Sequence, residues 1–203
     1  MPSIEEIQQY LTGAWRMMTG KPDGLKLLDI SADGFWNSFF AIVVALPALI
    51  VGWASVANEI AAEPAVTASR FSLLLRLAFV DLGTWVLPLA ALALAARPAG
   101  IADRFVHYVV SSNWGSALIV WIMLPPALLR LVVPDAAELA TIVSLGLFGV
   151  TLVLGWRLTN AAIGRGPGVA TGVFAGMFVA SLIVLFVLQA LFGLGPSEQP
   201  AMG

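Results

Sequence analysis

The sequence predicts an all-α integral membrane protein, a bundle of five transmembrane helices preceded by an amphipathic helix at the membrane interface. Sixty per cent of the 203 residues are apolar and 11% are charged, whereas soluble domains carry about 25% charged residues. The apolar residues gather in five long stretches, 35–57, 71–96, 105–133, 139–158 and 169–193. Each stretch reaches the roughly 20 residues that a helix needs to cross the hydrocarbon core.

This pattern divides the chain into a cytoplasmic head (1–34), a five-helix membrane domain (35–195) and a short external tail (196–203), and leaves no room for a separate soluble catalytic domain. The first apolar run is too long and too late for a signal peptide, so we expect it to be a retained span. The net charge of −2 gives no basic surface for nucleic acid. Cysteine is absent and His107 is the single histidine, so we expect no metal and no cofactor.

The head carries the signature of an amphipathic helix. Ser3 and Glu6 have the spacing of a capping box, in which each side chain satisfies a backbone N–H of the other residue. The apolar residues that follow recur at helical spacing: Ile4, Ile7, Leu11, Ala14, Trp15 and Met18. Gly20 ends the helix, and Trp15 with Arg16 suits an interfacial anchor. The helix either docks a partner and senses the surface or packs against the bundle or the bilayer, and we favour the second interpretation.

The basic residues predict how the chain threads through the membrane. Seven fall on one side of the predicted spans: Arg16, Lys21, Lys26, Arg97, Arg104, Arg157 and Arg165. Three fall on the other: Arg70, Arg76 and Arg130. Because lysine and arginine in short flanks favour the cytoplasm, we expect the N-terminus inside and the C-terminus outside a bacterial inner membrane.

Polar side chains within the second and third spans are the candidate intramembrane sites, namely Asp81, Arg76 and Asn113. Arg76 lies close enough to the span end to reach the interface with its long side chain. Asp81 is ten residues into its span, about 15 Å of helix, and therefore near the midplane. Its expected partner is Asn113 or Thr84, or it is protonated without an ion pair. We consider two roles for Asp81: it binds a proton or cation in a transport cycle, or it holds two helices together by hydrogen bonds. We favour the second role, a clamp between helices, because a single carboxylate has no second acid or histidine to relay a proton.

An intramembrane hydrolase is a third, weaker interpretation. Ser111 follows His107 by one helical turn, and the polar side chains of Ser112 and Asn113 are adjacent. A Ser–His hydrolase needs a nucleophile, a base and an oxyanion hole in fixed geometry. Here serine and histidine share one predicted helix without a Gly-x-Ser-x-Gly elbow, and interfacial placement explains His107. We therefore expect a protein that is not an enzyme.

The last span carries a packing signal that resembles a glycine zipper. Small residues recur at four-residue spacing and form a flat groove: Gly168, Gly172, Gly176 and Ala180. Such faces allow close helix approach in lipid. The groove is either a homodimer seam or the docking site of another span of the same chain, and we favour the internal site. Prolines in the first three spans predict kinks, at Pro47, Pro88 and the pair Pro125 and Pro126.

In its order of elements the chain resembles the Yip1 family in its bacterial form. The run Asp81-Leu82-Gly83 with Pro88 further on is similar to a family motif, although it lies inside the second span rather than before the first. The run Phe105-Val106-His107-Tyr108, followed by small residues through Gly115 and Ser116, is similar in texture to the family core. The resemblance implies a non-enzymatic membrane protein that associates with membrane proteins or shapes the bilayer.

The sequence therefore predicts a protein of membrane organisation, assembly or accessory type, whose partners are the lipid bilayer and either another membrane protein or further copies of the chain. The alternative is a small transporter or permease component that uses the intramembrane carboxylate of Asp81.

Overall fold

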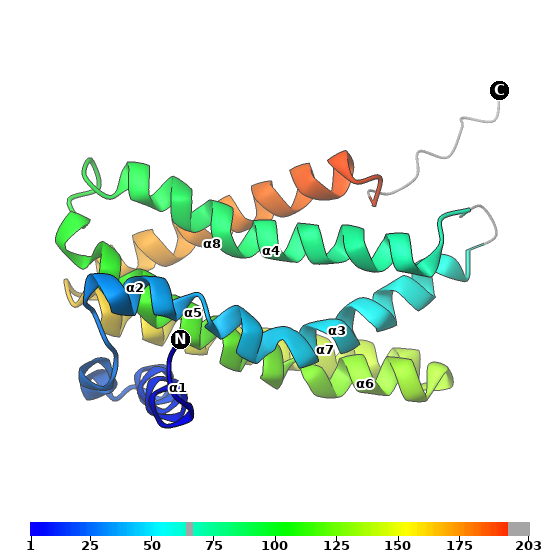
Figure 1. Cartoon of the computed structure of the whole chain (residues 1–203), viewed down its shortest axis with the longest axis horizontal. Coiled ribbons are helices and arrows are strands. Elements are labelled where there is room, and N and C mark those ends of the chain that lie inside the picture. Colours follow the sequence, from blue (N-terminus) through cyan, green and yellow to red (C-terminus); the bar gives the residue numbers. More distant parts are fainter. Residues whose placement is uncertain (64–66, 195–203) are drawn as a thin grey trace.

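Figure 1 shows the computed structural model, which describes residues 1–63 and 67–194 of the chain. The described residues form helices and no strands, so the predicted all-helical class is confirmed. The tail expected over 196–203 lies outside the described residues. In chain order the elements are α1 (Ile4–Met18), η1 (Pro22–Leu27), α2 (Ala32–Ser38), α3 (Ala41–Ala61), α4 (Arg70–Ala95), η2 (Ala102–Arg104), α5 (Phe105–Ile122), α6 (Leu124–Val132), η3 (Pro134–Ala136), α7 (Ala137–Ile163) and α8 (Pro167–Leu191).

Five helical segments are long and apolar enough to cross a membrane: Ala32–Ala61, Arg70–Ala95, Ala102–Val132, Ala137–Ile163 and Pro167–Leu191. We refer to them as the five candidate spans. Each contains or closely matches one of the apolar stretches in the sequence, and the fourth extends five residues beyond its predicted end at 158. They run along the long axis of the molecule in Figure 1.

Two of the candidate spans are interrupted. The first breaks at Phe39 and Phe40, between α2 and α3. The third breaks at Met123, just before Pro125 and Pro126 in the first turn of α6. Proline is compatible with a first helical turn, but it cannot bond back into a preceding helix, so α5 ends there. Pro47 and Pro88, in contrast, lie inside the continuous helices α3 and α4.

Helix α1 lies across the spans and is seen end-on in Figure 1, packed against α5 and α7. The predicted capping box is confirmed, because Ser3 N donates to Glu6 Oε2 at 2.7 Å and Glu6 N to Ser3 Oγ at 3.2 Å. The predicted apolar face is wrong in part, since Ile4 is 76% and Trp15 46% exposed. The buried face is instead Tyr10, Gly13, Ala14, Met17 and Met18. Small residues at its centre allow α1 to approach the spans closely, which rotates the helix away from its bulkier apolar positions.

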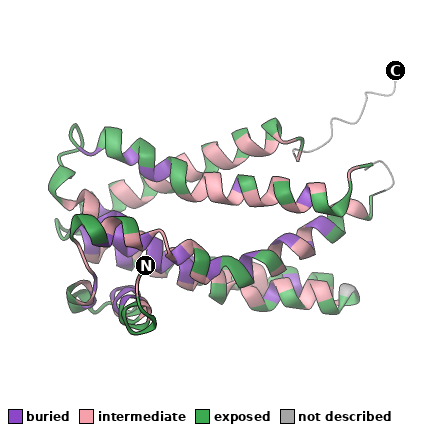
Figure 2. Ribbon diagram, viewed as in Figure 1, coloured by how far each residue is buried: buried purple, intermediate pink, exposed green. Residues whose placement is uncertain are grey.

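Buried residues concentrate where α1, α3, α5 and the C-terminal part of α7 meet (Figure 2). Helices α4 and α8 pair with one another alongside this core. Towards the end of α8, Leu188 packs onto Gly83 of α4, where an added Cβ would overlap Leu188 Cδ1. In α8 the one buried residue of the helix is Ala170, so most of this helix faces the surroundings or the interior space described next.

Candidate functional site: a polar cavity between the spans

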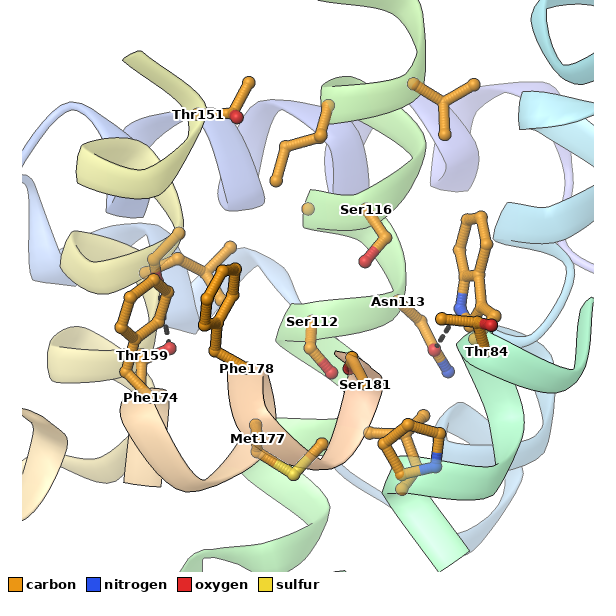
Figure 3. A pocket seen from close by; sticks show the side chains of 18 of the residues that line it. Thr84, Ser112, Asn113, Ser116, Thr151, Thr159, Phe174, Met177, Phe178 and Ser181 are labelled. Atoms are coloured by element: carbon orange, nitrogen blue, oxygen red, sulfur yellow. Dashed lines mark hydrogen bonds between the residues drawn. The ribbon is translucent and has the colours of Figure 1, made fainter. Parts of the chain in front are cut away.

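A cavity of about 450 Å³ lies between the candidate spans. Side chains of all five spans and of α1 line it (Figure 3). The cavity sits near the middle of the spans: Asp81 is residue 12 of 26 in α4, Thr151 is residue 15 of 27 in α7 and Phe178 is residue 12 of 25 in α8. Isolated polar groups are costly at that depth in a bilayer unless they face protein or a water-filled space.

The cavity wall combines hydroxyl, amide and carboxyl groups with aromatic rings. Its polar members are Asp81, Thr84, Tyr108, Ser112, Asn113, Ser116, Thr151, Thr159 and Ser181. Figure 3 shows Thr84 and Asn113 on one side of the cavity and Phe174 and Phe178 on the other. Those two phenyl rings stack with centroids 6.5 Å apart. Thr84 and Asn113 thus mark one end of the cavity, at α4 and α5, and Phe174 and Phe178 mark its aromatic end at α8, beside Thr159 of α7.

Asp81 is held by a residue that the sequence analysis missed. Trp53 of α3 donates its indole N–H to Asp81 Oδ2 at 2.6 Å. The expected partners were wrong, because neither Asn113 nor Thr84 bonds to the carboxylate in the described chain. The clamp between two helices that we favoured is thus observed, and it joins α3 to α4. Asp81 also lines the cavity, so the clamp does not remove it from the site.

Asn113 is the centre of a second polar junction. Its Nδ2 donates to Ser38 Oγ at 2.8 Å, and its Oδ1 accepts a hydrogen bond from Trp85 Nε1 at 2.9 Å. Ser38 in turn donates to the carbonyl oxygen of Phe35 at 2.7 Å. This junction joins α2, α4 and α5. Since Trp85 is one turn beyond Asp81 on α4, a single stretch of α4 is hydrogen-bonded to a neighbour on each side.

Thr84 lies between these two junctions and has a hydroxyl without a partner. Its Oγ1 is buried and makes no hydrogen bond to any described residue. Thr84 lines the cavity one turn along α4 from Asp81. A buried hydroxyl left without a partner costs free energy, and Figure 3 shows the Thr84 oxygen turned away from the cavity.

Arg76 does not belong to the cavity wall. Its guanidinium donates from Nη1 to the carbonyl oxygen of Phe192 at 3.0 Å, just beyond the end of α8. The last carbonyl groups of a helix lack partners within the helix and carry a partial negative charge. Arg76 therefore fastens α4 to the end of α8, and it makes no ion pair with Asp81 in the described chain.

The residues considered for an enzyme do not form a catalytic pair. Ser111 Oγ donates to the sulfur of Met17 at 3.8 Å, and His107 Nδ1 is buried without a partner among the described residues. Ser111 is fully buried under α1. The hydroxyl is thus engaged in docking the head and does not face the cavity.

Helix α1 reaches the cavity through its C-terminal turn. Met18 is fully buried and belongs to the cavity wall, and the ring of Tyr10 lies 5.2 Å from that of Trp114 on α5. Burial, with smaller effects of Glu6 and Asp29, raises the pKa of Tyr10 above its ordinary value. The head is therefore part of the packed structure and not a separate surface helix.

The predicted interfacial anchors lie on the outer side of α1. Trp15 is 46% exposed, and Arg16 pairs with the carboxylate of Asp23 in η1. At the same end of the molecule Arg165 binds the carbonyl oxygen of Gly100 and, at 2.7 Å, the carboxylate of Asp103. The loops after α4 and after α7 thus meet at the end where the head lies.

The small-residue face of α8 is open. A Cβ added at Gly168, Gly172 or Gly176 would meet nothing within 4 Å. Gly172, Gly176 and Ala180 line a groove of about 440 Å³ between α8 and the end of α4. The internal docking favoured from the spacing is therefore not observed at the three glycines, within the part of the chain that the structure describes.

These features define a helical protein with five candidate membrane spans, an N-terminal docked helix and a mostly apolar cavity between the spans that carries a few polar groups. Comparison of the chain with protein-family models, with curated proteins and with solved structures finds no match in any of the three. The likeness to the Yip1 family stays a prediction from the order of elements.

Proposed function

We propose that this protein crosses a membrane five times and admits a small polar or amphipathic solute into the cavity between its spans. It acts as a small transporter or permease component and forms no covalent intermediate. The cavity of about 450 Å³ carries this proposal, because ligand sites in proteins are concave, mostly apolar and furnished with a few convergent polar groups. The membrane of this proposal is a bacterial inner membrane, and the charge asymmetry supports an orientation with the N-terminus in the cytoplasm and the C-terminus outside.

Water access to the cavity tests the proposal. Because the sequence contains no cysteine, an introduced cysteine is the single reactive thiol. We expect a Ser116→Cys variant in native membranes to react with the water-soluble reagent ethylammonium methanethiosulfonate, since thiols react as thiolates, which form in water. An Ala175→Cys variant is the control, because Ala175 is exposed on α8 outside the cavity wall and faces lipid if the protein crosses the membrane as proposed.

A second substitution shows that the reaction occurs through the cavity. Ser181→Trp places a large ring in the cavity from α8 and is expected to block labelling of Ser116→Cys, whereas Ala175→Trp leaves it unchanged. If Ser116→Cys and Ala175→Cys react at the same slow rate, water-soluble molecules do not reach the cavity and the transport proposal is wrong.

A specific observation also favours the other candidate function, association with a further membrane protein or a second copy through α8. The open glycines Gly168, Gly172 and Gly176 leave the backbone of α8 accessible at close range. Van der Waals packing between such faces drives helix association in lipid.

The double substitution Gly172→Leu and Gly176→Leu tests association by mild crosslinking in native membranes followed by size analysis in detergent. We expect loss of the crosslinked species, because the new side chains hold a partner helix away. Gly146→Leu is the matched control, since Gly146 on α7 is also free of neighbours within 4 Å. An unchanged crosslinking pattern in the double variant means that α8 is not an association surface.

A further inference from the structure

We infer that the solute taken by this cavity is an organic ammonium ion with an apolar or aromatic tail. The inference rests on the proposed function and specifies its ligand class. It follows from three properties of the wall: its single acidic side chain, the free oxygen of that side chain and the position of its aromatic rings.

The cavity wall carries one acidic side chain and no basic one. Asp81 is the single acidic residue among the lining residues, and no lysine, arginine or histidine lines the cavity. Two arginines on nearby elements are engaged elsewhere, Arg76 at the end of α8 and Arg165 in the loop contacts. An anionic solute would meet a carboxylate with no compensating charge, which is costly away from bulk water. A cation gains from the same carboxylate.

The carboxylate keeps acceptor capacity for such a cation. Trp53, which does not line the cavity, occupies Oδ2 from the α3 side. Oδ1 makes no hydrogen bond to a described residue. An ammonium group has several N–H donors, and one of them can bond to this free oxygen.

The aromatic end favours an organic over an inorganic cation. Phe174 and Phe178 stack on one another on the side of the cavity opposite Thr84. In Figure 3 three serines lie between this pair of rings and Thr84, namely Ser112, Ser116 and Ser181. Trp85, whose indole N–H is bound to Asn113, adds a ring beside Asp81 on α4. Aromatic faces attract ammonium groups and accommodate apolar tails. A hard metal cation instead prefers several carboxylates or carbonyl oxygens, and the cavity wall offers one carboxylate.

Three probes that share one carbon frame test the charge preference: phenethylammonium, 2-phenylethanol and phenylacetate. Their affinities are measured by isothermal titration calorimetry on the full-length protein in detergent. We expect phenethylammonium to bind at least about tenfold more tightly than the alcohol, and phenylacetate more weakly than both, because a carboxylate attracts the first and repels the last.

The variants identify the group responsible. Asp81→Asn keeps an oxygen for Trp53 and is expected to reduce phenethylammonium affinity about tenfold, to that of the alcohol. Thr84→Val, which preserves the shape of the side chain and removes a hydroxyl that is buried away from the cavity, is expected to leave both affinities within about threefold. Asp135→Asn is the control, since Asp135 is an exposed acid in η3 away from the cavity.

Two outcomes overturn the inference, and they are distinguishable. If the three probes bind equally and Asp81→Asn changes nothing, but Ser181→Trp abolishes binding, the ligand class is wrong and the cavity site stands. If none of the probes binds in a manner that Ser181→Trp abolishes, the ligand class and the cavity site both fail.

Discussion

At the scale of single residues, indole groups satisfy the buried polar side chains of this protein. Trp53 bonds to Asp81 and Trp85 bonds to Asn113, each from a neighbouring helix. An indole brings one N–H donor on a large apolar body. It can therefore satisfy a carboxylate or an amide between helices without adding a second polar group that itself needs a partner.

The contact between Trp53 and Asp81 predicts a measurable stability. Trp53→Phe removes the donor and leaves the carboxylate oxygen without a partner, which costs about 1–3 kcal/mol. We expect a lower midpoint of thermal unfolding in detergent. Trp36→Phe is the control, because Trp36 is 72% exposed. Equal midpoints for the two variants would show that the hydrogen bond does not stabilise the fold.

Gly115 predicts a second effect at this scale. A Cβ at this position would lie 2.5 Å from Leu158 Cδ1 and 3.1 Å from Met18 Cε. Gly115→Ala should therefore displace the ends of these two side chains at the junction of α1, α5 and α7, at a cost of about 1 kcal/mol, and lower the thermal midpoint. A Cβ added at Gly146 has no neighbour within 4 Å. Gly146→Ala should therefore raise the thermal midpoint, because alanine is more favourable than glycine in a helix by about 0.5–1 kcal/mol. Shifts of the same sign in both variants contradict this packing.

At the scale of elements, the docking of α1 is the feature most open to experiment. The bond between Arg16 and Met17 is a trypsin site in sequence, but Met17 is fully buried against α5. Ala14→Leu adds a large side chain to a fully buried position on the docked face, so we expect faster cleavage at Arg16. Gln8→Leu changes an exposed position of the same helix and should leave the rate unchanged. If trypsin cleaves Ala14→Leu after Arg16 as slowly as it cleaves the parent protein, α1 stays docked despite the larger side chain and the prediction is wrong.

The elements themselves could largely be read from the sequence. The lengths of the apolar stretches predict the five candidate spans, and the capping box predicts the start of α1. Both features depend only on residues that are close along the chain. The buried face of α1 could not be predicted, since its orientation depends on which surface of α5 and α7 it meets. The break at Phe39 and Phe40 also carries no proline or glycine signal.

The sequence predicts Asp81 as a site residue, but it does not predict the hydrogen-bond partner of Asp81 or the cavity around it. Length along the helix placed Asp81 near the middle of its span, and the structure agrees. Its partner lies 28 residues away on another helix, and such pairing depends on helix rotation, which hydropathy does not report. The cavity is formed by the packing of all five spans side by side, so no local sequence pattern predicts it.

At the scale of the whole molecule, the threading makes a direct prediction. We expect a membrane-impermeant maleimide to label Asp135→Cys in intact cells, because η3 lies at the end predicted to be external. Arg97→Cys, in the loop after α4 at the opposite end, should label only after the cells are permeabilised. Both positions are exposed, and the parent chain has no cysteine. The reverse pattern would invert the proposed orientation.

The position of Met18 gives the molecule a mechanical property. One side chain of the helix that lies across the spans forms part of the cavity wall, beside a glycine whose missing Cβ leaves room for it. A sideways displacement of that helix, by a bound neighbour or by a membrane around the spans, would therefore change the dimensions of the cavity.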